Sequence, residues 1–243
     1  LSDAADEVYF ISEVSTIFPG IIDDFFKKSP VMQKYFEKVI DAEKKIFGEI
    51  DFLPKNVFQL SIKSGDLNLL REKQLARCLN SDLFIVFGSS YIKGWLVNFL
   101  VGKKAINIHM GLSPYYRGSS CNFWALYDNN PGYVGATIHL LSKGLDSGDI
   151  IFHSLPDINY IKNQFYFTMS AVLSAQNDLA NAIITRELNT IKPEKQETHL
   201  QLRYSTRADF TDNIVAGFLK KISSIDEKNI EKPKLKLLEQ PNC

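Results

Sequence analysis

The sequence lacks several features that mark particular classes of protein. It has three cysteines in 243 residues, Cys78, Cys121 and Cys243, which have no metal-binding spacing and cannot all pair within the chain. Its 28 basic and 28 acidic residues balance, which argues against a broad nucleic-acid surface but leaves a local basic patch open. No apolar run reaches the roughly 20 residues that span a bilayer, and the amino end has no signal-peptide layout. We therefore expect no metal, no nucleic acid, no membrane contact and a cytoplasmic location.

Apolar runs alternate with segments of helical periodicity, which predicts an α/β fold with a Rossmann-like, mostly parallel sheet flanked by helices. The expected strands are residues 7–12, 57–61, 82–87, 105–109, 135–141 and 149–153, with one or two more around 199–204. The expected helices are one or two within 21–47, broken at Pro30, and others at 69–79, 165–191 and 211–222. Ligands of such sheets bind beyond the carboxyl ends of the strands, which is where Gly88, Asn107 and Asp146 fall.

An amide, an imidazole and a carboxylate follow these strand ends. Asn107 and His109 are two positions apart and so face the same side of a strand, and Asp146 lies in a glycine-rich run. An amide N–H can donate to a developing oxyanion, an imidazole can carry a proton, and a carboxylate favours the charged imidazole. The three side chains therefore predict a site for acyl transfer.

Each of these residues also has an ordinary interpretation when it is taken alone. An Asn-x-His pair at a strand end is usually structural, and an aspartate in a glycine-rich loop is usually a turn residue. The other histidines have no comparable neighbours in the sequence, so we expect structural or surface roles for His139, His153 and His199.

Residues 107–124 read Asn-Ile-His-Met-Gly-Leu-Ser-Pro-Tyr-Tyr-Arg-Gly-Ser-Ser-Cys-Asn-Phe-Trp. This run resembles the signature of the folate-dependent formyltransferases: Asn-x-His, a Leu-x-Pro turn, an aromatic-Arg-Gly step and then an aspartate in a glycine-rich loop. Asp146 follows His109 by 37 positions, close to the spacing of the family. The resemblance is clearest over residues 82–153. It implies the formyltransferase fold, catalytic roles for Asn107, His109 and Asp146, and 10-formyltetrahydrofolate as co-substrate.

The resemblance also implies binding segments. Two strand-end turns correspond to the main-chain walls of the family's pterin pocket, although both could be ordinary turns. Their residues are Gly88, Ser90, Tyr91, Ile92 and Lys93 in the first turn, and Leu141, Ser142, Lys143 and Gly144 in the second. Substrate contacts are expected from Met110, Tyr115 and Arg117, with Arg117-Gly118 as the hinge of a mobile lid.

The acceptor is the least determined part of the interpretation. Methionyl-tRNA formyltransferases carry a further RNA-binding domain, whereas 50 residues follow Pro193 here, and the enzyme for glycinamide ribonucleotide needs a glycine-rich phosphate cradle that is not visible. The Asn-Phe-Trp after Arg117-Gly118 resembles short enzymes that formylate amino sugars. The leading acceptor is therefore a small primary amine, most simply that of a nucleotide-linked amino sugar. A hydrolase and a non-catalytic folate-binding module remain as alternatives.

The expected domain division places residues 1–194 in the catalytic domain and 195–243 in a small C-terminal extension with a loose tail. Family members usually open with a strand, a turn and a helix before the strand expected at 7–12, and this unit is expected to be missing here. Part of the acceptor site would then be missing too. A homodimer is left open.

Overall fold

The computed structural model describes residues 1–14, 28–49, 51–221, 230 and 233–238. Its central sheet has the order β3 (Ile85–Phe87), β4 (Ile106–His109), β6 (Ala136–Leu140) and β7 (Ile150–Ser154). β3 and β4 run parallel, whereas β6 is antiparallel to both β4 and β7. The predicted α/β class is confirmed. The pairs β4–β6 and β6–β7 are antiparallel, whereas a mostly parallel sheet was expected.

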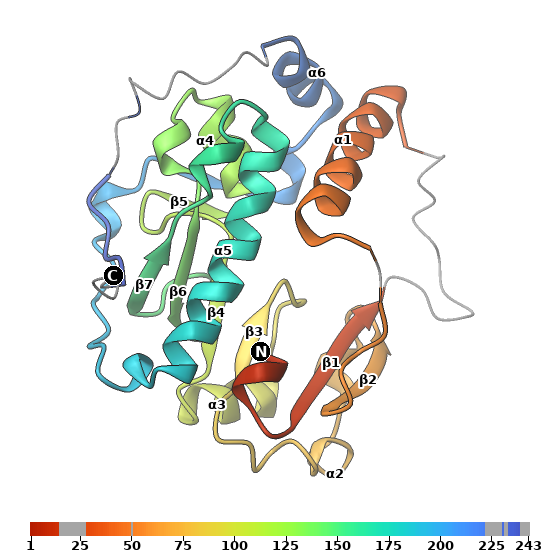
Figure 1. Cartoon of the computed structure of the whole chain (residues 1–243), viewed down its shortest axis with the longest axis vertical. Coiled ribbons are helices and arrows are strands. Elements are labelled where there is room, and N and C mark those ends of the chain that lie inside the picture. Colours follow the sequence, from red (N-terminus) through yellow and green to blue (C-terminus); the bar gives the residue numbers. More distant parts are fainter. Residues whose placement is uncertain (15–27, 50, 222–229, 231–232, 239–243) are drawn as a thin grey trace.

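The core of this sheet lies on the face where the apolar residues of the alternating strands β4 and β6 meet α5 (Gln164–Ile184). Ile106, Ile108 and Ile138 are at most 5% exposed and pack with the small and aliphatic residues of α5, such as Leu179. Figure 1 shows α5 running along β6 and β7. α3 (Gly94–Gly102), which the periodicity analysis missed, joins β3 to β4 and buries Leu96 in a second apolar cluster.

A second, two-stranded parallel sheet lies beside the central one (Figure 1). It consists of β1 (Val8–Val14) and β2 (Val57–Lys63). Between β2 and β3 the chain makes a short 3-10 turn (Asp66–Leu69) and the four-residue helix α2 (Glu72–Leu75) in place of the longer helix expected at 69–79.

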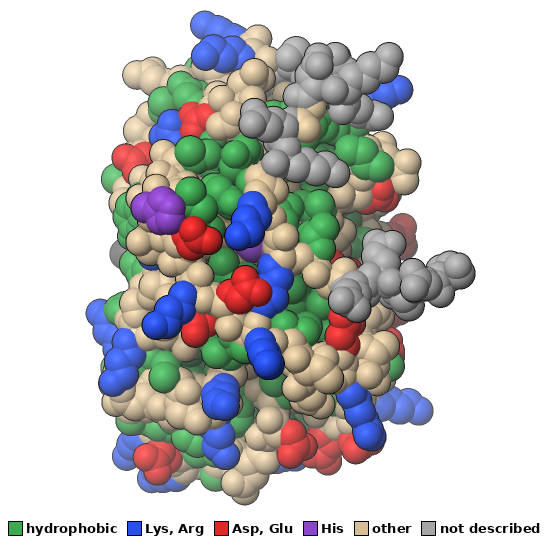
Figure 2. Space-filling view, turned by 90° about the vertical axis from the view of Figure 1, so that its left-hand side faces the viewer, with side chains coloured by type: hydrophobic (Ala, Val, Ile, Leu, Met, Phe, Trp, Pro, Cys, Tyr) green, Lys and Arg blue, Asp and Glu red, His purple; other side chains and the backbone are tan. Residues whose placement is uncertain are grey.

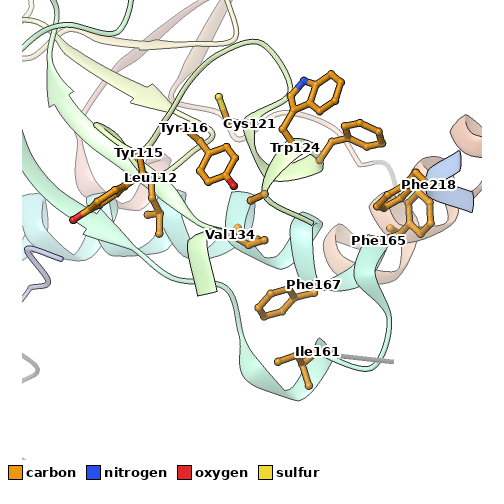
Figure 3. Packing of buried hydrophobic residues seen from close by; sticks show 14 residues of the cluster. Leu112, Tyr115, Tyr116, Cys121, Trp124, Val134, Ile161, Phe165, Phe167 and Phe218 are labelled. Carbon is orange, nitrogen blue, oxygen red and sulfur yellow. The ribbon is translucent and has the colours of Figure 1, made fainter. Parts of the chain in front are cut away.

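α1 (Pro30–Phe47) starts where a break was expected. The Ser29 hydroxyl accepts a hydrogen bond from Met32 N, and Pro30 occupies the first turn, where its missing N–H costs nothing. The part of the expected helical region at residues 21–27 lies outside the described residues. α1 packs against α5 and α6 (Asp212–Lys221) through aromatic rings, and Figure 3 shows Phe165 and Phe218 in this cluster.

Arg117 and Gly118 lie in a strand, so the expected lid hinge is wrong. β5 (Tyr116–Gly118) pairs in parallel with β8 (Arg203–Ser205). Gly118 has φ +91°, and a Cβ at this position would lie 2.0 Å from the Ser205 carbonyl oxygen. Only glycine permits this backbone conformation together with so close an approach.

The described part of the tail, residues 233–238, is hydrogen-bonded to the body, which differs from the expected loose tail. His153 N donates to Lys236 O at 2.6 Å, Lys236 N donates to His153 Nδ1 at 3.0 Å, and the Tyr115 hydroxyl donates to Lys234 O at 3.0 Å. Figure 2 shows acidic and basic side chains interspersed on one face, in keeping with the balanced charge. None of the described helices is both long enough and apolar enough to cross a bilayer.

Candidate active site

Asn107 and His109 occupy β4 with the apolar Ile106 and Ile108 between and beside them. The alternation puts both polar side chains on one face, while the isoleucines enter the core. Asn107 is partly exposed and His109 is 7% exposed. The strand therefore presents an amide and an imidazole side by side at its carboxyl end, as predicted.

Asp146 comes to this pair from the loop between β6 and β7. Its Oδ1 lies 3.4 Å from His109 Nδ1 and 3.9 Å from His139 Nε2. Its backbone has φ +45°, a left-handed conformation that is costly for a residue with a Cβ. The structure thus brings the three predicted catalytic residues together around His109.

His139 is a fourth member of this cluster, and the sequence interpretation missed its role. Its Nδ1 lies 2.8 Å from Leu140 O and must donate there, so Nε2 accepts from Asn107 Nδ2 at 3.0 Å. Burial, together with the nearby His109, lowers the pKa of His139 to about 4, although the bond to Leu140 acts in the opposite direction. A neutral His139 therefore orients the Asn107 amide and leaves its second N–H for another acceptor.

The register of the sheet explains this contact. Asn107 lies directly opposite His139 in the antiparallel β4–β6 ladder, and His109 lies opposite Thr137. The only signal in the sequence was the polar His139 within an apolar strand. Its meaning depended on knowing that the two strands pair antiparallel in this register.

The second nitrogen of His109 faces the buried side of the site. His109 Nε2 lies 3.4 Å from Tyr116 O and 3.5 Å from Cys121 Sγ. A Cβ at Gly111 would lie 2.9 Å from this nitrogen, so a side chain there would push on the imidazole. Burial, with Asp146 nearby, raises the pKa of the Cys121 thiol to about 12, so it is no thiolate nucleophile at neutral pH.

The turn after His109 is fixed to the neighbouring strands. The Thr137 hydroxyl donates to Gly111 O at 2.6 Å and accepts from Ser113 N at 2.8 Å. His153 Nε2 donates to Ser113 O at 2.8 Å, and burial lowers the pKa of His153. The Leu-Ser-Pro turn is therefore held from β6 and β7, which gives His153 the structural role that we predicted.

The two predicted pterin-binding turns approach each other. The Tyr91 hydroxyl donates to Lys143 O at 3.0 Å, which joins the loop at 88–93 to the loop at 141–148. Gly88 follows β3 directly and has φ +59°. This arrangement places two strand-end turns at the same edge of the sheet as Asn107, and their contact with folate stays a prediction.

The loop at 88–93 is held by side chains from the amino-terminal part of the chain. The Glu13 carboxylate at the end of β1 accepts from Ser90 N at 2.6 Å, from the Ser90 hydroxyl at 2.8 Å and from Gly65 N at 2.9 Å. Asn68 donates to Tyr91 O at 2.8 Å and accepts from Lys93 N at 2.6 Å. The Ser90 N–H therefore already has a partner within the protein.

The three predicted substrate-contacting residues lie in different surroundings. Tyr115 is 7% exposed and its hydroxyl donates to Lys234 O, so its side chain lies in the core and not on the open surface of the site. Met110 is half-buried and packs against two of the apolar clusters. Arg117 reaches the site edge, where its guanidinium donates to Leu145 O at 2.9 Å.

The Asn-Phe-Trp segment that suggested an amino-sugar acceptor lies in α4 (Cys121–Tyr127). All three of its residues are buried, and Asn122 Oδ1 accepts from Gly135 N at 3.0 Å. The segment therefore packs into the fold around the site. In the part of the chain that the structure describes, no three histidine, cysteine or carboxylate side chains are grouped as a metal site requires.

Comparison with known proteins agrees with this geometry. Residues 71–165 match the family model for formyl transferases. Over this segment the chain is similar to the formyl transferase family. The match contains β4, the turn after it, His139 and the Asp146 loop, so the family predicted from the sequence is confirmed where the site residues lie.

Individual relatives match different parts of the chain. It is 25% identical over 134 residues to the methionyl-tRNA formyltransferase of Trichodesmium erythraeum, which covers 55% of this chain and 38% of that protein. It is 32% identical over 104 residues to the mitochondrial formyltetrahydrofolate deformylase 2 of Arabidopsis thaliana, covering 42% of this chain and 31% of that protein. The chain thus spans about two fifths or less of the length of these curated relatives.

Solved structures show the same fold over a longer stretch. A 4-N formyltransferase from Francisella tularensis matches with a TM-score of 0.51 and 18% identity, covering 98% of this chain and 99% of that one. A sugar N-formyltransferase from a Shewanella species matches with a TM-score of 0.50 and 16% identity, covering 96% and 99%. These likenesses establish the formyltransferase fold.

Proposed function

We propose that this protein transfers a formyl group from 10-formyltetrahydrofolate to the primary amine of a small molecule. The observation that carries the proposal is the meeting of Asn107, His109 and Asp146 at one strand end, within the segment that matches the formyl transferase family. An amide donor, an imidazole and a carboxylate are what the transfer of a formyl group between two nitrogens requires.

The reaction places negative charge on the formyl oxygen while the attacking nitrogen loses a proton. The second N–H of Asn107 is a donor for that oxygen, and the imidazole of His109, whose Nδ1 lies 3.4 Å from Asp146 Oδ1, is the group beside it that can carry the proton. A bond forms between the formyl carbon and the amine nitrogen, and the bond to N10 of the folate breaks. The proton that leaves the amine ends on N10. The amine must be neutral to attack, so the rate rises with pH until it has titrated.

Folate would bind between the loop at 88–93 and the loop at 141–144. Two observations support this place: both loops lie at the site edge of the sheet, and Tyr91 joins them through Lys143 O. When bound there, 10-formyltetrahydrofolate supplies the activated formyl group. The contacts proposed are mainly with the main chain.

A nucleotide-linked amino sugar is the acceptor we propose. The resemblance of residues 117–124 to short amino-sugar enzymes supports it, and the sugar N-formyltransferase from Shewanella has the same fold over nearly the whole chain. Glycinamide ribonucleotide and methionyl-tRNA are the alternative acceptors. Water is a further alternative, favoured by the similarity to the Arabidopsis deformylase.

The test is to mix the protein with 10-formyltetrahydrofolate and one acceptor at a time, and to follow tetrahydrofolate by absorbance. The panel contains nucleotide-linked amino sugars, glycinamide ribonucleotide, methionyl-tRNA and no amine. We expect turnover with an amino sugar and none with Asn107→Ala. Turnover without amine would show a hydrolase, and folate binding without turnover of any amine would show a non-catalytic binding module.

A further inference from the structure

Asp146, the proposed catalytic carboxylate, has a backbone conformation that residues with a side chain rarely adopt. Asp146 has φ +45°, in the left-handed region that favours glycine over residues with a side chain. Such a conformation persists only where the surroundings fix it. The question is therefore which groups outside the loop hold it.

The side-chain amide of Gln196 binds the loop on both sides of Ser147. Gln196 Nε2 lies 2.8 Å from Asp146 O and 2.8 Å from Gly148 O. An amide nitrogen has two N–H groups, so both carbonyls are satisfied at once. The reverse orientation of the amide would set an oxygen against two carbonyl oxygens, so the donor role of this nitrogen is unambiguous.

The chain after α5 delivers Gln196 to this place through backbone pairing. Ile150 N donates to Glu194 O at 2.7 Å, and Glu194 N donates to Ile150 O at 2.8 Å. In an antiparallel pair, the residue two positions beyond Glu194 lies opposite the one two positions before Ile150, which is Gly148. Gln196 thus lies where its amide can reach the loop.

Arg117 holds the same loop from the other direction, because its guanidinium donates to Leu145 O at 2.9 Å. The carbonyls of residues 145, 146 and 148 therefore all accept from side chains that come from distant parts of the chain. We propose that Gln196 is a positioning residue for the proposed formyl transfer: with Arg117, it holds the loop so that the Asp146 carboxylate lies beside His109.

This inference rests on the proposed function, since it gives Gln196 a role through Asp146. Asp146 Oδ1 and His109 Nδ1 are 3.4 Å apart, and misplacement of a catalytic group by about 1 Å can cost on the order of a hundredfold in rate. Gln196 lies outside the segment that matches the family, so a family motif would not reveal it.

The first test is Gln196→Ala, with Gln196→Glu as a variant of the same size that lacks both N–H donors. We expect kcat to fall about tenfold or more in both variants, while KM for 10-formyltetrahydrofolate changes by less than about threefold. Gln59→Ala on β2 is the control, because the Gln59 amide donates to the Ser12 and Ser61 hydroxyls and lies in the other sheet. Wild-type kcat in Gln196→Ala would overturn the proposal.

A second measurement separates positioning from a general structural role. If Gln196 acts through Asp146, Gln196→Ala should add less than about twofold to the loss in Asp146→Asn. Equal fold losses in the two backgrounds would overturn the proposal.

A third measurement needs no substrate. Amide hydrogen exchange of the segment 141–150 should increase in Gln196→Ala and not in Gln59→Ala. Unchanged exchange in Gln196→Ala would show that Gln196 does not hold this loop. If exchange increases in Gln196→Ala but the wild-type protein formylates nothing, Gln196 holds the loop and the proposed function is wrong.

Discussion

The two loops at the site edge of the sheet are held in opposite ways. The loop at 88–93 donates the Ser90 N–H and hydroxyl to an ionised carboxylate, Glu13, whereas the loop at 141–148 offers carbonyls to a neutral amide, Gln196. Both loops lie within the segment that matches the family, and both of these holding residues lie outside it. The matched segment therefore contains the proposed catalytic side chains, whereas Glu13 and Gln196, which hold its two loops, lie before and after it.

The loops also differ in what they carry. The loop at 141–148 contains Asp146, so loosening it should lower the rate of the chemical step. The loop at 88–93 carries none of the proposed catalytic side chains, so loosening it should weaken folate binding and spare the chemical step. The predictions below test this division, beginning with the largest effect.

Removal of the reactive side chains should have the greatest effect. Asn107→Ala, His109→Ala and Asp146→Ala should each lower kcat about a hundredfold or more, because each loses a donor or a charge at the developing oxyanion. Steady-state kinetics measures the loss, and thermal unfolding by circular dichroism checks that each variant is folded. Near-full activity in any one of them would remove that residue from the mechanism.

Glu13→Gln should weaken folate binding about tenfold and change kcat by less than about twofold. The amide oxygen is a weaker acceptor than a carboxylate, and hydrogen bonds to charged groups contribute roughly 1.5–3 kcal/mol. Isothermal titration with a folate analogue measures the affinity. Glu7→Gln is the matched control, since Glu7 accepts from the Tyr9 hydroxyl just before β1 and is exposed. A fall in kcat alone would contradict the division between the loops.

The loop at 88–93 should lose its support in acid, because the group that holds it is a carboxylate. Partial burial raises the pKa of the Glu13 carboxyl, but hydrogen bonds from Ser90 and Gly65 outweigh it and hold this pKa below its ordinary 4.5. The carboxylate therefore stabilises its loop fully above pH 4.5, and the stabilisation is lost as pH falls through the lowered value.

Hydrogen exchange measured from pH 6 down to pH 3, corrected for the intrinsic exchange rate, should show this loss at residues 88–93. The wild-type loop should lose protection in acid, while in Glu13→Gln protection should be low and independent of pH. The same acid response in both proteins would contradict the assignment to Glu13.

Ser90→Ala should have the smallest effect. It removes one of three hydrogen bonds to Glu13 and leaves the Ser90 N–H bond in place, so folate affinity should change by less than about threefold. The same titration measures it. A loss larger than that of Glu13→Gln would show that the serine hydroxyl itself contacts the ligand.

The sequence was sufficient for contacts that depend on local periodicity. Asn107 and His109 share a face because they are two residues apart in a strand, and Asp146 was placed at the same sheet edge because it follows another strand. The strands containing Val57 and Ile150 were likewise predicted close to their observed positions.

Contacts across strands and between distant segments could not be predicted in this way. His139 meets Asn107 only because β6 runs antiparallel to β4 in one register. Gln196 reaches Asp146 because Glu194 pairs with Ile150, and Glu13 reaches Ser90 from a different sheet. Nothing in the neighbouring residues of the sequence encodes those distances, since they arise from tertiary packing.

The fate of the formyl carbon tests the central claim most directly. The protein is incubated with 10-formyltetrahydrofolate labelled with ¹³C in the formyl group and a nucleotide-linked amino sugar, beside an Asp146→Ala control, and the label is located by NMR. We predict that the wild type places the label in a new formamide on the sugar, while the control leaves it on folate. Label released as formate, or retained on folate by the wild type with every amine offered, would contradict formyl transfer.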